Sequence, residues 1–68
     1  SLLVDRWQPI MQDADWITAE QLREAGGYVH TSSVHEQMRR LIEAGRVETD
    51  TRSNGRARVM HYRWKQQP

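Results

Sequence analysis

HTSSVHEQMRRLIEAGRV, residues 30–47, is the stretch of this chain that decides its fold. It opens with hydroxyl residues, and Thr31 or Ser32 can cap a helix by accepting a hydrogen bond from a free amide. Apolar residues then recur as one buried helical stripe, formed by Val34, Met38, Leu41 and Ile42. Gly45 follows where a helix ends. The segment predicts a helix whose exposed side carries Ser33, His35, Glu36, Arg39 and Glu43.

A β-hairpin is predicted directly after this helix, in VETDTRSNGRARVMHYRW, residues 47–64. Asn54-Gly55 is a strong turn signal, because a type I′ turn needs positive φ at both central residues. With these two residues as the loop, Ser53 pairs with Arg56. One face of the hairpin, which can close over the helices, then carries Val47, Thr49, Met60, Tyr62 and Trp64. The other face carries Glu48, Arg52, His61 and Arg63.

The start of the chain predicts a short helix with a single apolar stripe. Pro9 belongs in or near its first turn, where a missing amide is tolerated, and residues 2–4 form an irregular lead-in. Asp13 and Asp15 mark its end. The stripe contains Leu3, Trp7, Ile10, Met11 and Ala14. Because the chain has no phenylalanine, the expected large core residues are Trp7, Trp16 and Trp64.

A second helix is expected over residues 19–25. Thr18 and Gln21 have the spacing of a capping box at its start, and Gly26-Gly27 ends it, since glycine adopts the left-handed conformation at little cost. The apolar pair before it, residues 16–17, is a candidate short strand. The predicted order is therefore helix, short strand, helix, helix and hairpin.

The composition describes one small domain. With 68 residues, the chain forms a single unit with an ordered core over about residues 5–64 and a frayed tail over 65–68. It has no cysteine, which excludes disulfides and thiolate zinc sites. No apolar run is long enough to span a membrane. We expect a soluble, cytoplasmic protein with no membrane partner.

The net charge of +1 conceals a segregation of charge along the chain. Residues 1–36 hold two basic and six acidic side chains, a net charge of −4. Residues 37–68 hold eight basic and three acidic side chains, a net charge of +5, and no acid follows Arg52. A positive field concentrated in one part of a surface attracts a polyanion whatever the total charge.

The sequence indicates neither a metal site nor catalysis. His30, His35 and His61 lack the i, i+4 spacing of helical metal ligands, and no carboxylate completes a set. No nucleophile–base arrangement and no glycine-rich phosphate loop is present. We expect a protein without cofactor and without enzymatic activity.

The predicted order of elements is that of a winged helix-turn-helix domain, an α+β fold. Residues 30–47 resemble, without a gap, the recognition-helix segment of GntR-type regulators, S-R-T-T-V-R-E-A-L-R-R-L-E-A-E-G-L-V. Ser32 and Ser33 match its hydroxyl pair, and the outright matches are Val34, Glu36, Arg39, Arg40, Leu41, Gly45 and Val47. Residues 61–64, HYRW, are similar to the wing strands of ArsR-type regulators.

The resemblance covers residues 16–64 at the level of fold. It implies binding of double-stranded DNA with the third helix in the major groove. The resemblance does not imply a GntR effector domain. Thr31 and His35 stand where the family usually has arginines, so the family's base preference does not transfer.

We expect DNA contacts from the start and the exposed face of the third predicted helix and from the wing, which is the predicted hairpin. These residues are Thr31, Ser32, Ser33, His35, Glu36, Arg39, Arg52, Asn54, Arg56 and Arg58. A helix N-terminus attracts phosphate, Arg39 can contact guanine, and Glu36 can accept from cytosine. An arginine-rich wing can lie along the phosphate backbone of DNA or enter a minor groove. The structural alternatives are simple capping, surface ion pairs and charges that keep the hairpin soluble.

The function expected from these residues is that of a transcriptional regulator or a phage or plasmid accessory factor. Two alternatives stay open: a winged helix that binds a protein in a larger assembly, and a binder of structured RNA. The small size also favours a homodimer or a larger parent protein.

Overall fold

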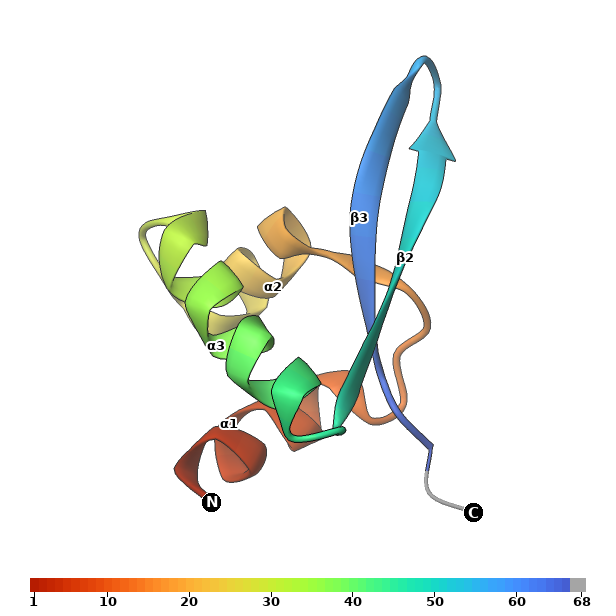
Figure 1. Ribbon diagram of the computed structural model, residues 1–68. Coiled ribbons are helices and arrows are strands. Elements are labelled where there is room, and N and C mark those ends of the chain that lie inside the picture. Colours follow the sequence, from red (N-terminus) through yellow and green to blue (C-terminus); the bar gives the residue numbers. More distant parts are fainter. Residues whose placement is uncertain (67–68) are drawn as a thin grey trace.

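A computed structural model describes residues 1–66, which contain three helices and three strands in an α+β arrangement (Figure 1). Along the chain these are α1 (Leu2–Met11), β1 (Ile17–Thr18), α2 (Ala19–Gly26), α3 (Thr31–Glu43), β2 (Val47–Asn54) and β3 (Ala57–Trp64). The strands form one antiparallel sheet in the order β1-β3-β2. The winged-helix arrangement predicted from the sequence is confirmed, with β2 and β3 as a hairpin that extends beyond the helices.

The core lies between the three helices and the root of the hairpin. Its buried residues are Trp7, Met11, Leu22, Val34, Met38, Leu41, Val47, Tyr62 and Trp64. Two residues predicted for the core are at its margin: Ile42 is 38% exposed and Met60 is 50% exposed. Met60 does lie on the inward face of β3, but at a level that the helices leave largely uncovered. Only the root of the hairpin therefore takes part in the core.

Helix α1 begins earlier than the sequence predicted. Residues 2–4 are helical, and the Ser1 hydroxyl accepts a hydrogen bond from the Val4 amide, which satisfies a free amide at the helix start. Pro9 therefore lies near the end of α1, not in its first turn. The prediction gave too much weight to the proline and too little to the serine cap.

Helix α2 starts with the predicted capping box and ends at a left-handed glycine. The Thr18 hydroxyl accepts from the Gln21 amide at 3.1 Å, and the Gln21 side chain accepts from the Thr18 amide at 2.9 Å. Gly27 follows with φ 73°. Gly26 is the last helical residue, one beyond the predicted end.

The turn between α2 and α3 is fastened to α1 by Tyr28. Its ring stacks on Trp7 with centroids 5.8 Å apart, and its hydroxyl hydrogen-bonds with the Gln37 side chain. The Trp7 indole donates to the same Gln37 oxygen at 2.7 Å. Arg6 also donates to the Tyr28 hydroxyl. One hydrogen-bonded group thus fixes α1, the turn and the first half of α3 relative to one another.

The register of the hairpin differs from the prediction by two residues. Asn54 pairs with Ala57, so the loop is Gly55-Arg56, and Ser53 pairs with Arg58 instead of Arg56. Of the two loop residues, only Gly55 has positive φ, 67°, as in a type II′ turn with glycine first. This register places Val47 opposite Trp64, two buried residues. A shift of two keeps every side chain on its predicted face, because the side-chain period of a strand is two.

No helix within residues 1–66 combines the length and the apolar character needed to cross a bilayer. The predicted tail begins at Lys65, whose amide still donates to the Arg46 carbonyl at 2.8 Å. Residues 67 and 68 of that tail lie outside the described part of the chain.

Candidate nucleic-acid interface

The N-terminal end of α3 is open to solvent. Its N-cap is His30, with extended backbone and no side-chain hydrogen bond to the helix, so the prediction of a hydroxyl cap at Thr31 or Ser32 is wrong. Thr31 is already the first helical residue. The reason is geometric, because a residue inside the helix cannot place its side chain over the amides ahead of it. These first amides have no partner within the helix.

The predicted contact residues at this end are accessible. Ser32, Ser33 and His35 are exposed, and Thr31 is half-buried. The first turn of α3 contains no acidic residue that would compete for the amides. An anion approaching this end would meet free amide hydrogens, hydroxyl groups and the positive end of the helix dipole.

The middle and end of α3 carry a closed network of ion pairs. Arg39 Nη2 lies 2.9 Å from Glu36 Oε1, and Arg39 Nη1 lies 2.7 Å from Glu43 Oε1. Arg40 Nε lies 3.3 Å from the same Glu36 oxygen. Hydrogen bonding and charge from Arg39 lower the pKa of Glu36 and correspondingly raise the pKa of Arg39. Two arginines and two glutamates thus make the exposed face of α3 electrically neutral.

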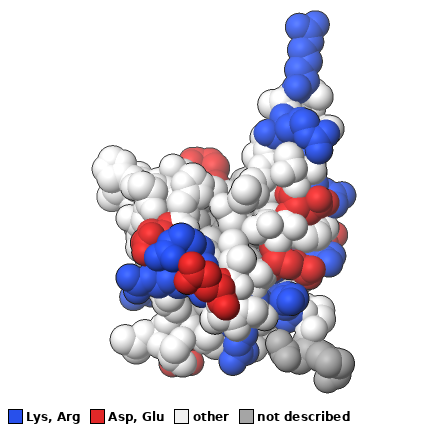
Figure 2. Space-filling view, viewed as in Figure 1, with Lys and Arg blue, Asp and Glu red and all other residues white. Residues whose placement is uncertain are grey.

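The tip of the hairpin has the opposite character. Arg56 and Arg58 are exposed and have no carboxylate partner among the ion pairs of residues 1–66. The one hydrogen bond from Arg58 is a long one, 3.4 Å, to the Thr51 carbonyl. In Figure 2 the charged side chains at the tip are all basic, whereas acidic and basic side chains are mixed over α3 and lower on the hairpin.

Arg52 does not share this freedom. It lies on the opposite face of the hairpin from Arg58, because its cross-strand partner is Val59, while Arg58 pairs with Ser53. The Arg52 guanidinium lies 5.7 Å from the ring centroid of Trp16 and 3.3 Å from the Asp50 carboxylate. The three arginines that bracket the turn in the sequence are therefore not one cluster in space.

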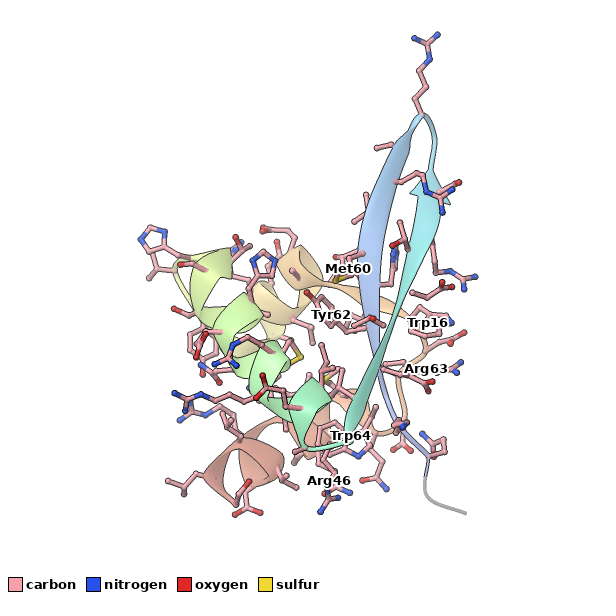
Figure 3. The ribbon with its side chains drawn as sticks, viewed as in Figure 1. Trp16, Arg46, Met60, Tyr62, Arg63 and Trp64 are labelled. Carbon is pink, nitrogen blue, oxygen red and sulfur yellow. The ribbon has the colours of Figure 1, made fainter. Side chains whose placement is uncertain are left out.

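Trp16 and Arg63 form a contact that sequence reasoning missed. Pairing of Ile17 with Tyr62 turns Ile17 inward, so Trp16 faces outward by alternation and is not in the core. The Arg63 guanidinium lies 4.2 Å from the centroid of the Trp16 ring and 3.1 Å from the Glu48 carboxylate. Figure 3 shows Trp16 and Arg63 on the side of the sheet opposite Met60, Tyr62 and Trp64. The register of β1 was the signal that could have located this contact.

The remaining predicted residue, Asn54, is the last residue of β2. Its backbone pairs with Ala57 beside the turn. Of the predicted set, the exposed hydroxyls and His35 thus lie at the start of α3, Glu36 and Arg39 in its ion-pair network, and Arg56 and Arg58 at the tip of the hairpin.

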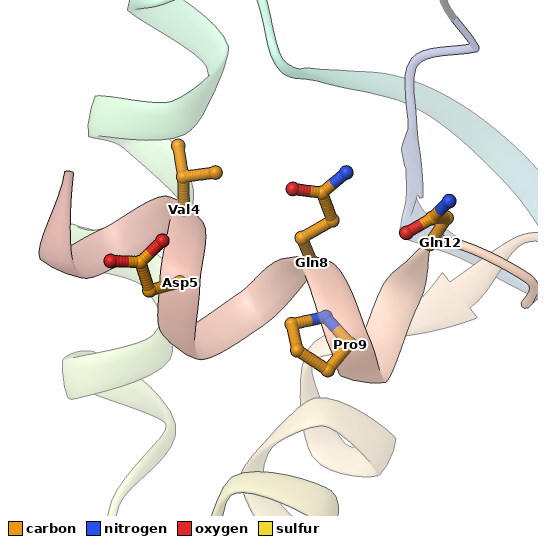
Figure 4. A pocket seen from close by; sticks show the side chains of 5 residues that line it. All are labelled: Val4, Asp5, Gln8, Pro9 and Gln12. Carbon is orange, nitrogen blue, oxygen red and sulfur yellow. The ribbon is translucent and has the colours of Figure 1, made fainter.

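An open groove runs along α1, away from these residues. It is lined by Val4, Asp5, Gln8, Pro9 and Gln12 (Figure 4). Asp5 is its one ionisable side chain, and a lone exposed carboxylate provides no nucleophile–base pair. Within residues 1–66, no three histidine, aspartate or glutamate side chains gather as metal ligands.

Comparison with known proteins assigns no family to the chain: no family model, no curated protein and no solved structure matches it.

Proposed function

We propose that this protein binds double-stranded DNA, with α3 in the major groove and the hairpin tip on the backbone or in the adjacent minor groove. The observation that carries the proposal is that two features attractive to an anion, the open N-terminus of α3 and the basic tip of the hairpin, both project from the body of the molecule. In Figure 1 the N-terminal end of α3 lies at the upper left, level with the middle of β3, and the hairpin tip extends above it at the upper right. A duplex that spans the two would meet both.

The two features would contribute differently to binding. Arg56 and Arg58 have no carboxylate partner within residues 1–66, so they supply affinity for phosphate that is independent of sequence. Ser33 and His35 are short exposed groups on the helix, and they are the candidates for contacts to base edges. Such a module serves a transcriptional regulator or a phage or plasmid accessory factor, which would act in the cytoplasm at the nucleoid.

A titration at several salt concentrations tests the proposal. Labelled duplex DNA, single-stranded DNA and a hairpin RNA are each titrated with the protein, and log affinity is plotted against log salt. Duplex binding should weaken linearly, with a slope of about −0.9 for each phosphate neutralised. Equal or tighter binding of the RNA hairpin would favour an RNA target. No salt-sensitive binding to any of the three would end the proposal.

Substitutions separate backbone contacts from base contacts. Arg56→Ala and Arg58→Ala should weaken binding to all sequences alike, whereas Ser33→Ala and His35→Ala should change which sequence is preferred in a selection from random oligonucleotides. The length and symmetry of the selected motif also report whether one or two copies bind. Sequence-independent losses from all four substitutions would remove α3 as the element that reads bases.

The second candidate function is a winged helix that binds another protein in a larger assembly. The neutral ion-pair network on α3 favours it, because Glu36 and Glu43 would repel phosphate. The unpaired charge at the hairpin tip favours DNA, since a protein interface tends to exclude such charge from its centre. The salt titration decides between the two.

A further inference from the structure

The acidic residues of α3 are the feature that duplex binding leaves unexplained. A helix that enters a groove lined by phosphates normally benefits from basic residues, yet Glu36 and Glu43 occupy the exposed side of α3 beside its two arginines. Each carboxylate lies within ion-pair distance of Arg39. We therefore ask whether these two carboxylates keep Arg39 from contacting phosphate.

The geometry points to a clamp that withholds Arg39 from phosphate. Glu36 binds Arg39 through two nitrogens, at 2.9 Å and 3.3 Å, and Glu43 binds its remaining terminal nitrogen at 2.7 Å. All the nitrogens of the Arg39 guanidinium are therefore engaged by carboxylates. Glu36 also holds Arg40 Nε at 3.3 Å. The clamp lies at the surface, where the Arg39 side chain is 54% exposed.

We infer that Glu36 and Glu43 are specificity-determining residues, which suppress binding to DNA of arbitrary sequence. This inference rests on the proposed function. For Arg39 to reach a phosphate, it must leave two carboxylates, and these then face the polyanion unpaired. Contact becomes favourable only where the helix fits the base edges and gains enough to open the clamp. Arg39 then adds nothing to the sequence-independent affinity that the hairpin tip supplies.

Removal of the carboxylates tests the clamp. Glu36→Gln and Glu43→Gln each leave one excess positive charge on α3, and the double variant leaves two. Both side chains are exposed, so folding should be retained, and circular dichroism checks this. Asp13→Asn is the matched control, because it makes the same change in net charge at an exposed residue after α1.

The readout is binding to a short duplex of random sequence. Each single variant should tighten this binding about fivefold at low salt and steepen the salt slope by about one, and the double variant by about two. Asp13→Asn should do neither. Binding to the duplex recovered by selection should tighten less, so that the ratio of specific to random affinity falls in the variants.

The possible results separate the inference from the proposed function. If the parent protein and the double variant bind the random duplex with the same affinity and slope, the clamp is refuted while DNA binding stands. If Asp13→Asn has the same effect as Glu43→Gln, net charge explains the result and the clamp is again refuted. If neither the parent nor the double variant binds any duplex, both are refuted.

Discussion

The root and the tip of the hairpin use arginine in opposite ways. At the root, the Arg63 guanidinium lies over the Trp16 ring and is paired with Glu48, so its charge joins β3 to β2 and to the residue just before β1. At the tip, Arg56 has no carboxylate partner in the described chain, and no buried residue of the core lies beside it. The comparison shows that a run of basic residues in a sequence can divide into residues that make contacts within the protein and residues that are available to bind a partner. The division follows strand register, not spacing along the chain.

The largest expected effect comes from the root. Trp64→Ala removes a side chain that is 2% exposed, and it should lower the free energy of unfolding by about 3–5 kcal/mol, enough to unfold a domain of this size. Thermal unfolding followed by circular dichroism measures it. Met60→Ala is the control on the same face of β3, and at half exposure it should cost about 1 kcal/mol or less. Equal losses would mean that the core extends farther along the hairpin than described.

A change at the turn should have a smaller effect. Gly55→Ala forces a side chain into φ 67°, which costs about 1–2 kcal/mol for the hairpin tip. Because the tip does not touch the core, amide exchange should accelerate near the turn while residues of β2 at Val47 keep their protection. Loss of protection along the whole of β2 would contradict the separation of tip and root.

The Trp16 contact can be measured by a double-mutant cycle. Trp16→Ala and Arg63→Ala should show a coupling of about 1 kcal/mol in chemical denaturation, as expected for a partly desolvated cation–π pair. Trp16→Ala combined with Arg56→Ala should be additive, since these residues do not touch. A coupling near zero for the first pair would show that the stacked geometry contributes nothing to the joint between β1 and β3.

The smallest predicted effects concern DNA affinity within the hairpin. Arg58→Ala should weaken duplex binding about fivefold at low salt and reduce the salt slope by about one. Arg52→Ala should have a clearly smaller effect, because Arg52 lies on the other face, between Trp16 and Asp50. The comparison is made in one titration series with the same duplex. A larger loss from Arg52→Ala would place the DNA on the outer face of the sheet.

Much of the fold followed from local chemistry. The capping box at Thr18 and the glycine after α2 each depend on neighbours in sequence, and each was confirmed. The buried stripe of α3 was confirmed for Val34, Met38 and Leu41 but not for Ile42, which is exposed. The helix starts were less predictable, because the same hydroxyl residue can act as a cap or as the first helical residue. At the start of α3 the cap position went to His30 instead.

The candidate site was harder to predict from the sequence than the fold. Exposure of Ser33, His35 and Arg39 follows from helical period, and the structure agrees. Their charge environment depends on side-chain conformation, and the contacts of Arg52 and Arg63 with Trp16 depend on how β1 pairs with β3. Such long-range pairings are not encoded in the spacing of any one segment. The predicted DNA contacts therefore stay predictions that binding experiments decide.

Gly26 limits which residues this domain can carry at positions 7, 26 and 28. A methyl group at this position would lie 2.9 Å from the far edge of the Trp7 ring and equally close to the ring of Tyr28. Both rings belong to the hydrogen-bonded group that anchors Gln37 in α3. Descendants of this chain that gain alanine at residue 26 should therefore also carry a smaller aromatic or aliphatic residue at position 7 or 28. Such a coordinated replacement would alter the hydrogen-bonded group that joins α1 and the turn to α3.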